Sequence, residues 1–361
     1  RLPVTGAILQ RLTEKLDAGI ILRKGYFPTI RRSYKANLEQ VVYGTTSWMK
    51  QALIDIFNEI PYQQKTASSS AKIFFSPTNR QMIRAWRISK AAKIRFHWQE
   101  LFCAEQWNIG MVKRSISDFV TKESGQKMEW LPIPESNEYY ADPFGWEENG
   151  ELKIVFEHYH YKNQKGILAI SDARGEIKPL LEARVHLSYP FVLERSDSKE
   201  NNRVILPESH QSKTIFCFDS ANPKNGKVLL ENVPAIDATP VFYNNRWWIF
   251  CTHDGNYNNT NLFIYHAEEF DGPWLPHGNN PVKCDVRSAR PGGTPFVLNN
   301  KLFRPAQDCS ESYGEAIILN KITELTENSF SEIPNSRIEP EENWKFNKGL
   351  HTLSIAGNYI L

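Results

Sequence analysis

The chain has 361 residues, and its 43 Lys and Arg nearly balance its 41 Asp and Glu. With 23% charged and 41% hydrophobic residues, the composition excludes a disordered or fibrous protein, and the length predicts two or three domains. The near-neutral total hides an asymmetry: residues 1–120 hold 19 Lys and Arg against 8 Asp and Glu, whereas residues 121–361 hold 24 against 33. We therefore expect at least two chemically different units.

The apolar runs and the cysteines bear on the cellular location of the chain. The longest apolar runs, such as 247–251, are far too short to cross a bilayer, and no secretory signal is visible. The five cysteines are widely spaced and never form a C-x-x-C pair, so we expect free thiols rather than disulfides or a cysteine zinc site. These features favour a cytoplasmic location. The chain begins at Arg1 and ends inside the apolar run 359–361, which we interpret as a fragment cut at both ends.

The first predicted elements are two strand-like runs around a polar turn within residues 5–22. Thr5-Gly6, then 16–19 with the sequence L-D-A-G, then an apolar run resemble the late part of a folate-dependent formyltransferase core. The resemblance implies that Asp17 matches a catalytic aspartate of that family. The Asn and His that work with this aspartate, and the folate-binding half, have no counterpart here. We therefore expect no cofactor in this fragment, because a formyl-folate would belong to a missing upstream part; an ordinary turn at Asp17 is the alternative.

Two helices and a linker are predicted next. Apolar residues at helical spacing predict one helix over 33–59, so that residues 1–59 form the formyltransferase-like fragment. Residues 60–106 are expected to be a linker, with three consecutive serines, and a basic amphipathic helix over 78–105. Such a helix can lie on an anionic membrane surface or dock one domain on another. No nucleic-acid partner is expected, since no recognised fold or motif accompanies the charge.

From residue 140 onward one pattern recurs: a proline and an apolar residue, an apolar strand, a turn, and a second strand rich in aromatics. The prolines Pro143, Pro190, Pro240 and Pro295 are 47, 50 and 55 residues apart, and a weaker copy begins at Gly349. Repeats of roughly 40–50 residues with several strands each indicate a β-propeller. We therefore predict a mainly β protein in which residues 107–361 form a five-bladed β-propeller.

The turns and the ends of the propeller are also predictable. The pairs 149–150, 244–245 and 299–300 consist of Asn and Gly and mark turns between strands. The fifth blade is expected to be truncated, because the chain ends at its second strand. An early strand at 107–112 can supply a missing strand and close the ring.

Propeller geometry predicts where polar residues meet. The first strand of each blade lines the central channel and the second runs antiparallel, so first-strand starts and second-strand ends share one rim. Ionisable residues interrupt the apolar strands at these places in blade after blade. The starts contribute Asp142, Ser188, Tyr189, Asp237, Thr239, Arg290 and His351, and the ends contribute Glu157, His158, His160, Glu208, His210, His253, Asp254, Arg304, Gln307 and Asp308.

Carboxylates around a funnel suit sugar chemistry, since glycoside cleavage needs one carboxylic acid and one carboxylate acting as base or nucleophile. We expect Asp142, Glu208 and Asp237 to be catalytic, with Glu157 next. Because arginines can hold anions bidentately and the other polar groups can bond hydroxyls, substrate-binding roles are expected of Glu157, His158, Tyr189, His253, Arg290, Arg304, Gln307, Asp308 and His351. The rim histidines form no compact metal motif, so no metal is expected. The alternative is that strand-end carboxylates only cap turns and the aromatics only pack.

Two family resemblances follow from these residues. Residues 140–144, with the sequence Y-A-D-P-F, resemble the A-D-P opening of five-bladed family 43 glycosidases, in which that Asp is the general base. The fuller pattern is more similar to the glucosamine inositolphosphorylceramide transferase N-terminal domain, which accompanies a glycosyltransferase in plants and a formyltransferase-like domain in bacteria. It is carried by residues 140–144, 156–157, 188–190, 207–209, 237–240, 280–282, 304–308, 313–314 and 351–352. Family 43 enzymes also carry an Asp at the opening of blade two and a Glu at the opening of blade three. Neither is matched here, because blade two opens with Ser188-Tyr189-Pro190 and blade three with Asp237.

The resemblance implies a carbohydrate-active propeller that acts on or binds a sugar or nucleotide sugar in glycan or glycolipid biosynthesis, as part of a formyltransferase-linked transferase. A glycosyl or formyl transferase activity of the intact protein is favoured over hydrolysis. Two alternatives stay open: a glycoside hydrolase with Asp142 as base and Glu208 or Asp237 as acid, and a non-catalytic sugar-binding scaffold. The expected location is cytoplasmic, with membrane association through the helix at 78–105 as an alternative.

Overall fold

The computed structural model describes residues 3–14, 19–57, 59, 75–121, 128–172, 175–194 and 203–361. The chain divides into two compact units, residues 1–105 and 106–361, and each is described by itself. The basic helix falls within the first unit. The expected domain boundary at residue 59 borders residues outside the described ranges, so it stays a prediction.

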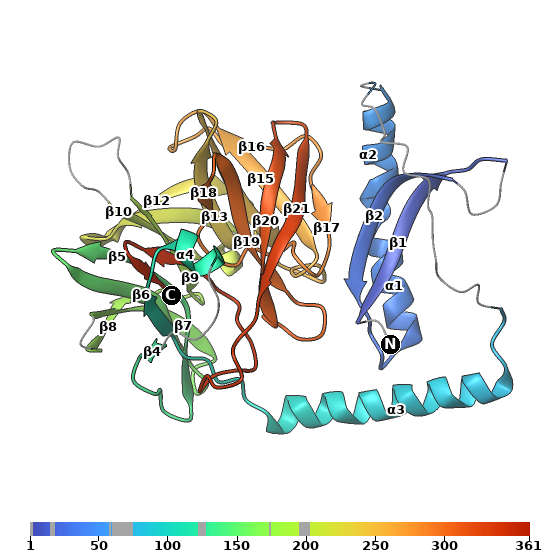
Figure 1. The fold of residues 1–361 in the computed structure, drawn as a ribbon, viewed down its shortest axis with the longest axis horizontal. Helices are drawn as coiled ribbons and strands as arrows, with labels where there is room; N and C mark the ends of the chain where they lie inside the picture. The colour runs from blue at the N-terminus through green and yellow to red at the C-terminus, as the bar shows by residue number, and fades with distance from the viewer. Residues whose placement is uncertain are drawn as a thin grey trace. The chain divides into compact units, whose positions relative to one another are not determined.

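The N-terminal unit opens with an antiparallel hairpin (Figure 1). Its strands are β1 (Val4–Arg11) and β2 (Ile20–Pro28), so the second strand-like run continues six residues beyond the expected end at residue 22. Asp17 lies outside the described residues, and its formyltransferase-like role stays a prediction. The Arg23 guanidinium of β2 forms an ion pair with the Asp55 carboxylate at 2.5 Å, which ties the hairpin to the helices that follow.

The single helix predicted over 33–59 is in fact two helices, α1 (Tyr34–Gly44) and α2 (Thr46–Phe57). The threonines at the break donate their hydroxyls to carbonyls in the last turn of α1, and Thr45 Oγ1 reaches the carbonyl of Val42 at 3.1 Å. Side-chain bonds of this kind compete with the helical ladder. The apolar spacing continues across the break, which is why periodicity alone predicted one helix.

Helix α3 (Asn79–Phe102) corresponds to the predicted basic helix. A capping box begins it, since the Thr78 hydroxyl accepts a hydrogen bond from the Gln81 N–H while the Gln81 side chain accepts one from the Thr78 N–H. No residue of α3 is buried, and Trp86 and Trp98 are each 61% exposed. Within the described residues, no helix has the length and apolar character needed to span a membrane. The membrane contact and the docking role expected of this helix both stay predictions.

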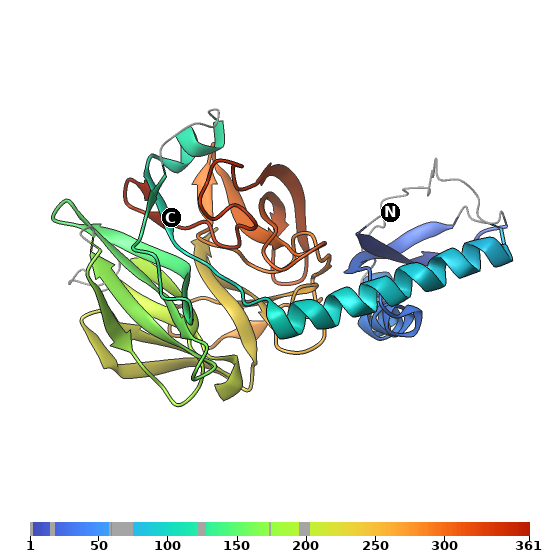
Figure 2. The same ribbon diagram turned by 90° about the horizontal axis from the view of Figure 1, so that it is seen from below.

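Residues 106–361 form five sheets that are the blades of a propeller (Figures 1 and 2). The first four blades follow chain order, and the prediction of a mainly β five-bladed propeller is confirmed. Blade 1 contains β5 (Glu138–Glu148), β6 (Glu151–His160), β7 (Lys165–Asp172) and β8 (Ile177–Leu181); blade 2 contains β9 (Ser188–Glu194), β10 (Arg203–Glu208), β11 (Thr214–Asp219) and β12 (Asn222–Glu231); blade 3 contains β13 (Ala235–Tyr243), β14 (Arg246–His253), β15 (Asn261–Ala267), β16 (Leu275–Pro276) and β17 (Lys283–Cys284); blade 4 contains β18 (Phe296–Leu298), β19 (Lys301–Asp308), β20 (Ala316–Leu325) and β21 (Phe330–Ile338). A short 3-10 helix, η1 (His210–Ser212), connects β10 and β11.

The fifth blade joins the two ends of the propeller unit. The C-terminal segment contributes β22 (Ile355–Ala356) and β23 (Tyr359–Ile360), and the blade is not truncated, because its sheet has four strands. Strand β3 (Gly110–Lys113) pairs with β23, and β4 (Glu129–Trp130) pairs with β3. The expected closing strand is therefore confirmed, and a further strand completes the sheet. Helix α4 (Ile116–Thr121) lies between β3 and β4 in the chain.

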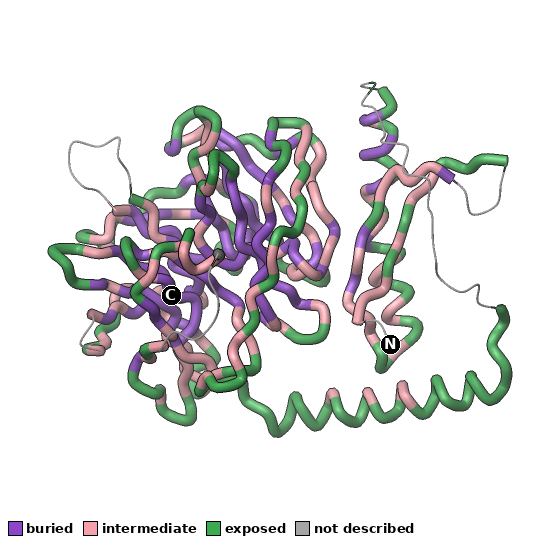
Figure 3. The backbone as a smooth tube through the Cα atoms, in the orientation of Figure 1, coloured by how far each residue is buried: buried purple, intermediate pink, exposed green. Residues whose placement is uncertain are grey.

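The predicted turns and buried strands explain the local structure. The three Asn-containing pairs at 149–150, 244–245 and 299–300 all have left-handed backbones, as two-residue hairpin turns of type I′ require. Buried residues are concentrated in the strands of the propeller (Figure 3). One core cluster joins neighbouring blades, since it includes Phe191 of blade 2 and Ile249 of blade 3. The five cysteines are free thiols, as expected, and four of them are buried.

Candidate functional site

The first strands of blades 1, 2 and 3 share one irregularity. In each, two residues stand opposite a single residue of the second strand, so these strands carry equivalent β-bulges. The first residue of the bulge is Asp142, Tyr189 or Asp237, with φ of 50°, 42° and 53° respectively. Non-glycine residues rarely adopt this left-handed region, and bulges re-aim side chains next to functional sites. These three residues therefore occupy equivalent positions in their blades.

This equivalence corrects the alignment of the repeats on their prolines. That alignment places Thr239 at the position of Asp142, because Pro240 and Pro143 match in sequence. In the structure the bulge of β13 begins at Asp237, which is the true counterpart of Asp142. Proline lies inside the bulge in blades 1 and 2 but after it in blade 3, so sequence spacing is a poor guide to the register.

A second set of polar residues comes from the second strands. Glu157 of β6, Glu208 of β10 and Thr252 of β14 each pair with the residue before the bulge of their blade. The four carboxylates of Asp142, Glu157, Glu208 and Asp237 belong to residues that are between 1% and 6% exposed. Their charges act on one another, since three of them raise the pKa of Glu157 and two raise that of Asp237. The structure thus brings together the expected catalytic set and Glu157.

Asp142 is held as an ionised carboxylate. Thr352 donates its hydroxyl to Asp142 Oδ1 at 2.7 Å, and His351 Nε2 lies 3.2 Å from the same oxygen. Burial alone would raise the pKa of Asp142, but the hydrogen bonds from His351 and Thr352 and the charge of Arg290 hold it below its usual value. A buried carboxylate that stays charged near neutral pH can accept a proton.

Glu208 is likewise held in its charged form. His210 Nδ1 lies 2.7 Å from Glu208 Oε1, and the backbone N–H of Asp237 donates to Glu208 Oε2 at 3.1 Å. Against the effect of burial, the His210 hydrogen bond and the charge of Arg290 lower the pKa of Glu208. The sequence analysis left Glu208 open as the acid of a hydrolase. A lowered pKa does not suit that role, which needs a protonated carboxyl group.

Asp237 is bound to two side chains of blade 4. Arg290 donates through Nε at 2.6 Å and Nη2 at 3.4 Å, and Gln307 Nε2 donates at 2.9 Å. The same guanidinium donates to Asn259 Oδ1 at 3.0 Å and lies 4.9 Å from the centre of the Tyr313 ring. Arg290 is therefore already neutralised by a protein carboxylate.

Glu157 differs from Asp142 and Glu208, whose pKa values are lowered. Its Oε1 atom is buried and has no hydrogen-bond partner among the described residues, and the nearest histidine nitrogen, His186 Nε2, is 3.6 Å away. Burial, followed by the charges of Asp142, Glu208 and Asp237, raises the pKa of Glu157 well above its ordinary value of 4.5. A hydrogen bond with the Tyr139 side chain opposes this shift without reversing it, so Glu157 holds its proton to higher pH than an ordinary glutamate.

A cavity beside Asp142 is lined mostly by aromatic and apolar side chains. Its lining includes Trp107, Tyr140, Asp142 and His351. The Trp107 ring meets the His351 ring edge-on at 4.3 Å between centroids, and Tyr313 lies 5.4 Å from His351. Flat rings beside a carboxylate suit a sugar, whose C–H faces pack on aromatics while its hydroxyls bond oxygen.

Four expected substrate-binding residues make contacts away from this group. Arg304 is fully buried and paired with Glu332, and Asp308 is paired with Arg337. The His253 ring stacks on Phe263 at 3.7 Å and bonds the Tyr265 hydroxyl, while burial lowers its pKa to about 4. His158 bonds Glu138 at 2.8 Å.

Tyr189 has a structural role, because its hydroxyl connects neighbouring segments inside the protein. It is fully buried, and its hydroxyl accepts the Gly293 N–H at 2.8 Å and lies 3.0 Å from Thr239 Oγ1.

The sequence analysis missed His186, because this residue lies outside the strand ends that were considered. Thr352 and Tyr313 stood in the quoted family pattern, but no site role was expected of them.

The unusual state of Glu157 gives a stability prediction. The unfolded chain loses the Glu157 proton near pH 4.5 while the folded chain keeps it, so wild-type stability falls as pH rises above that value. Glu157→Gln removes this loss, and we expect its melting temperature to exceed that of wild type by about 2–4 °C at pH 8. The two proteins should converge near pH 4. Scanning calorimetry across this range measures the effect.

The matched control is Glu231→Gln, because Glu231 is exposed at the end of β12. This variant should follow the wild-type melting temperature at every pH. A Glu157→Gln variant that melts below wild type at pH 8 would show that Glu157 is ionised in the folded protein.

Comparison with known proteins gives both sequence and structural matches. The family model described as "Glucosamine inositolphosphorylceramide transferase 1, N-terminal" matches residues 132–351. The protein of that name from Oryza sativa subsp. japonica is 31% identical over 211 residues, which cover 54% of this chain and 28% of the rice protein. The Arabidopsis thaliana protein of the same name is 30% identical over 210 residues, covering 54% of this chain and 27% of its own length. The match thus spans about a quarter of these curated relatives.

Solved glycosidase structures are similar at low identity. A Phanerochaete chrysosporium exo-β-1,3-galactanase with galactose has a TM-score of 0.43 and 10% identity, covering 55% of this chain and 49% of the galactanase. A thermostable family-43 glycoside hydrolase has a TM-score of 0.44 and 10% identity, covering 60% of this chain and 84% of the hydrolase.

Proposed function

The chain belongs to the glucosamine inositolphosphorylceramide transferase 1, N-terminal family, and from this premise we propose that its propeller binds a sugar in the channel during glycan or glycolipid assembly. The observation that carries the proposal is the buried group of Asp142, Glu157, Glu208 and Asp237, in which Thr352 and His351 bind Asp142 and lower its pKa while burial raises that of Glu157. Two titratable groups whose environments push their pKa values apart are the usual sign of an acid and a base.

The roles follow from the contacts of each carboxylate. Asp142 accepts a proton from a sugar hydroxyl or a water, because His351 and Thr352 keep it charged. Glu157 donates its proton to the oxygen on the other side of the bond that reacts, because its Oε1 atom is free. We therefore assign the role of the acid to Glu157 rather than to Glu208 or Asp237. His210 holds Glu208 as an anion, and Arg290 forms an ion pair with Asp237.

The charge of the channel selects the kind of sugar. Asp142 and Glu208 are held charged, the raised pKa of Glu157 leaves that residue uncharged, and the Arg290 guanidinium is already bound to Asp237. An acidic excess repels a diphosphate or a uronic acid and attracts an ammonium group. The curated relatives are named as transferases of glucosamine, which carries such a group. We therefore place a neutral or amino sugar in the channel, and the diphosphate of a nucleotide sugar outside it.

Calorimetric titration of the 361-residue chain at pH 7 tests this proposal with three probes: D-glucosamine, N-acetylglucosamine and D-glucuronic acid. Glucosamine should bind at least about tenfold more tightly than glucuronic acid, and Asp142→Asn should weaken it, whereas the exposed control Glu231→Gln should not. Equal binding of glucosamine and glucuronic acid, or no binding of any probe, contradicts the proposal.

The type of reaction and its context are parts of the same proposal. Transfer is favoured over hydrolysis by the named activity of the relatives, and hydrolysis of aryl glycosides or binding without turnover are the alternatives that rate measurements separate. The link to formyl transfer rests on the sequence resemblance of residues 5–22 alone.

A further inference from the structure

A second polar cluster lies in blade 1, outside the group of Asp142, Glu157, Glu208 and Asp237, which we call the channel group. It consists of Glu138 on β5 and His158 and His160 on β6. Side chains two residues apart on a strand share one face, and Glu138 stands directly opposite His160 in the register. Strand β5 begins at Glu138 and β6 ends at His160, so the cluster lies where this hairpin meets the rim.

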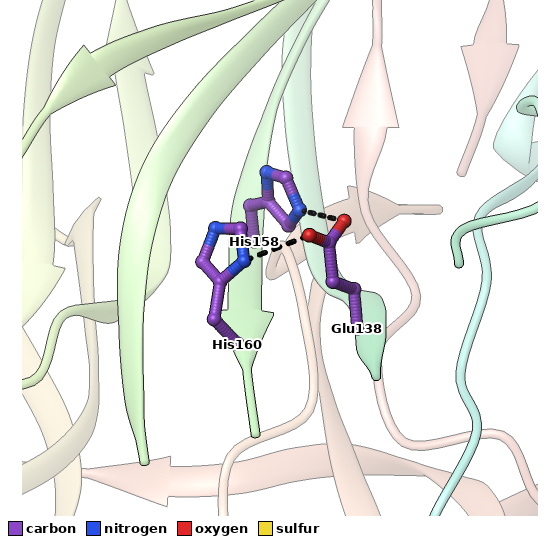
Figure 4. A group of neighbouring side chains, drawn as sticks. All are labelled: Glu138, His158 and His160. Carbon is purple, nitrogen blue, oxygen red and sulfur yellow. Dashed lines mark hydrogen bonds and ion pairs between the residues drawn. The ribbon is translucent and has the colours of Figure 1, made fainter. Parts of the chain in front are cut away.

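The three side chains point toward one another (Figure 4). His158 Nε2 lies 2.8 Å from Glu138 Oε2, and His160 Nδ1 lies 3.0 Å from Glu138 Oε1. The two imidazole rings are 4.1 Å apart between centroids, at 37° to each other. One ligand atom from each residue lies within 4.8 Å of the other two, so a small opening of the cluster admits an ion between them.

We propose that Glu138, His158 and His160 bind a divalent transition-metal ion of the zinc class. Two imidazole nitrogens and one carboxylate oxygen are a donor set that Zn²⁺ uses, with water in the fourth position. Nitrogen donors disfavour Ca²⁺ and Mg²⁺, which prefer oxygen. The three side chains are between 15% and 27% exposed, which leaves solvent access for the fourth ligand.

The local charge also fits a cation. In the described part of the chain, Glu138 forms ion pairs with these two histidines and with no Lys or Arg. The Glu138 carboxylate supplies a negative charge to the cluster, which a divalent ion compensates. Neutral imidazole and ionised carboxylate are the forms that ligate metals.

A bound ion has a structural consequence for the rim. It connects Glu138 at the start of β5 to His160 at the end of β6. Glu138 precedes Asp142 by four residues in β5. The Tyr140 ring contacts the His158 ring edge-on at 4.9 Å and lines the cavity beside Asp142. The Tyr140 ring therefore lies between the ion and the proposed sugar cavity. The bound ion stiffens the β5–β6 hairpin, which carries Asp142.

The test uses the full chain, free of affinity tags and stripped with a chelator, titrated with Zn²⁺ by calorimetry and with Co²⁺ by visible absorption. Wild type should bind one Zn²⁺ per chain with a Kd in the micromolar range or tighter, and Co²⁺ should show the d–d bands of nitrogen ligation. His160→Ala and Glu138→Gln should weaken Zn²⁺ at least about 100-fold, since removing a residue that merely orients a ligand already costs about 10- to 100-fold.

The control is His97→Gln on the exposed helix α3, which should bind as wild type does. Circular dichroism of each variant distinguishes the loss of a ligand from the loss of the fold, and Glu138→Gln keeps the volume of the side chain. Absence of a one-to-one complex with wild type at 100-fold excess Zn²⁺, or equal affinity in wild type and both cluster variants, overturns the proposal. Sugar binding is measured separately, so neither result decides the other.

Discussion

Arg304→Ala is expected to lower the free energy of unfolding by about 3–5 kcal/mol, because it leaves a buried carboxylate without its main partner. Arg304 is fully buried, and its Nη2 and Nε atoms donate to Glu332 at 2.6 and 3.0 Å. The guanidinium also donates to the carbonyls of Ser288 and Ala289. Lys283, 2.6 Å from Glu332, remains as the only other cation of this network in the described residues. Urea unfolding followed by fluorescence measures the loss.

Arg287→Ala is the matched control for this loss. Arg287 also pairs bidentately with an aspartate, Asp285, but its side chain is 43% exposed, so its removal should cost about 1 kcal/mol or less. The double variant Arg304→Met with Glu332→Leu should be more stable than Arg304→Ala, since it removes both buried charges. If Arg304→Ala unfolds at the wild-type urea concentration, the interpretation of Arg304 as a structural residue is wrong.

Asp142→Asn is expected to lower turnover by about 100- to 10,000-fold, the usual contribution of a positioned general base. The amide keeps the shape of the carboxylate but cannot accept a proton, and Thr352 and His351 still surround it. Initial rates with a nucleotide-activated glucosamine donor and an inositolphosphorylceramide acceptor, chosen from the name of the relatives, measure transfer, and p-nitrophenyl glucosaminide measures hydrolysis. The substitution should slow whichever of the two reactions the wild type performs.

Asp308→Asn provides a comparison for that rate. Asp308 is also a strand-end carboxylate and is also buried, but its partner is Arg337 rather than the channel group. Its rate should stay within about threefold of wild type once the folded fraction is taken into account. A wild-type rate that Asp142→Asn leaves unchanged removes Asp142 from the mechanism, and a wild type without either activity favours the scaffold alternative.

The blades were predictable because their signals are local. Strand alternation and the Asn-containing turns at 244–245 and 299–300 depend only on neighbouring residues. Four similarly spaced prolines and the weaker copy at Gly349 together indicated five repeats. Closure of the ring by β3 followed from counting strands. The break between α1 and α2 was hidden because Thr45 interrupts the backbone ladder without interrupting the apolar spacing.

The site was only partly predictable because it depends on direction and register. Asp142 and Asp237 were expected from strand position, but their equivalence needed the bulges. Arg304 and Gln307 lie in the same strand, yet only Gln307 reaches Asp237, while Arg304 pairs with Glu332. A strand position alone does not tell which side chain points into the channel. The pairing of His160 with Glu138 likewise joins residues 22 positions apart.

The central claim is that the buried carboxylates of the channel form a sugar site. A crystal structure of the full chain soaked with D-glucosamine tests it most directly. We predict electron density for one sugar ring with hydroxyl or amino groups within about 2.6–3.2 Å of Asp142 and Glu157. Density for the sugar elsewhere on the protein, with the four carboxylates in contact only with one another and with their protein partners, would contradict the account.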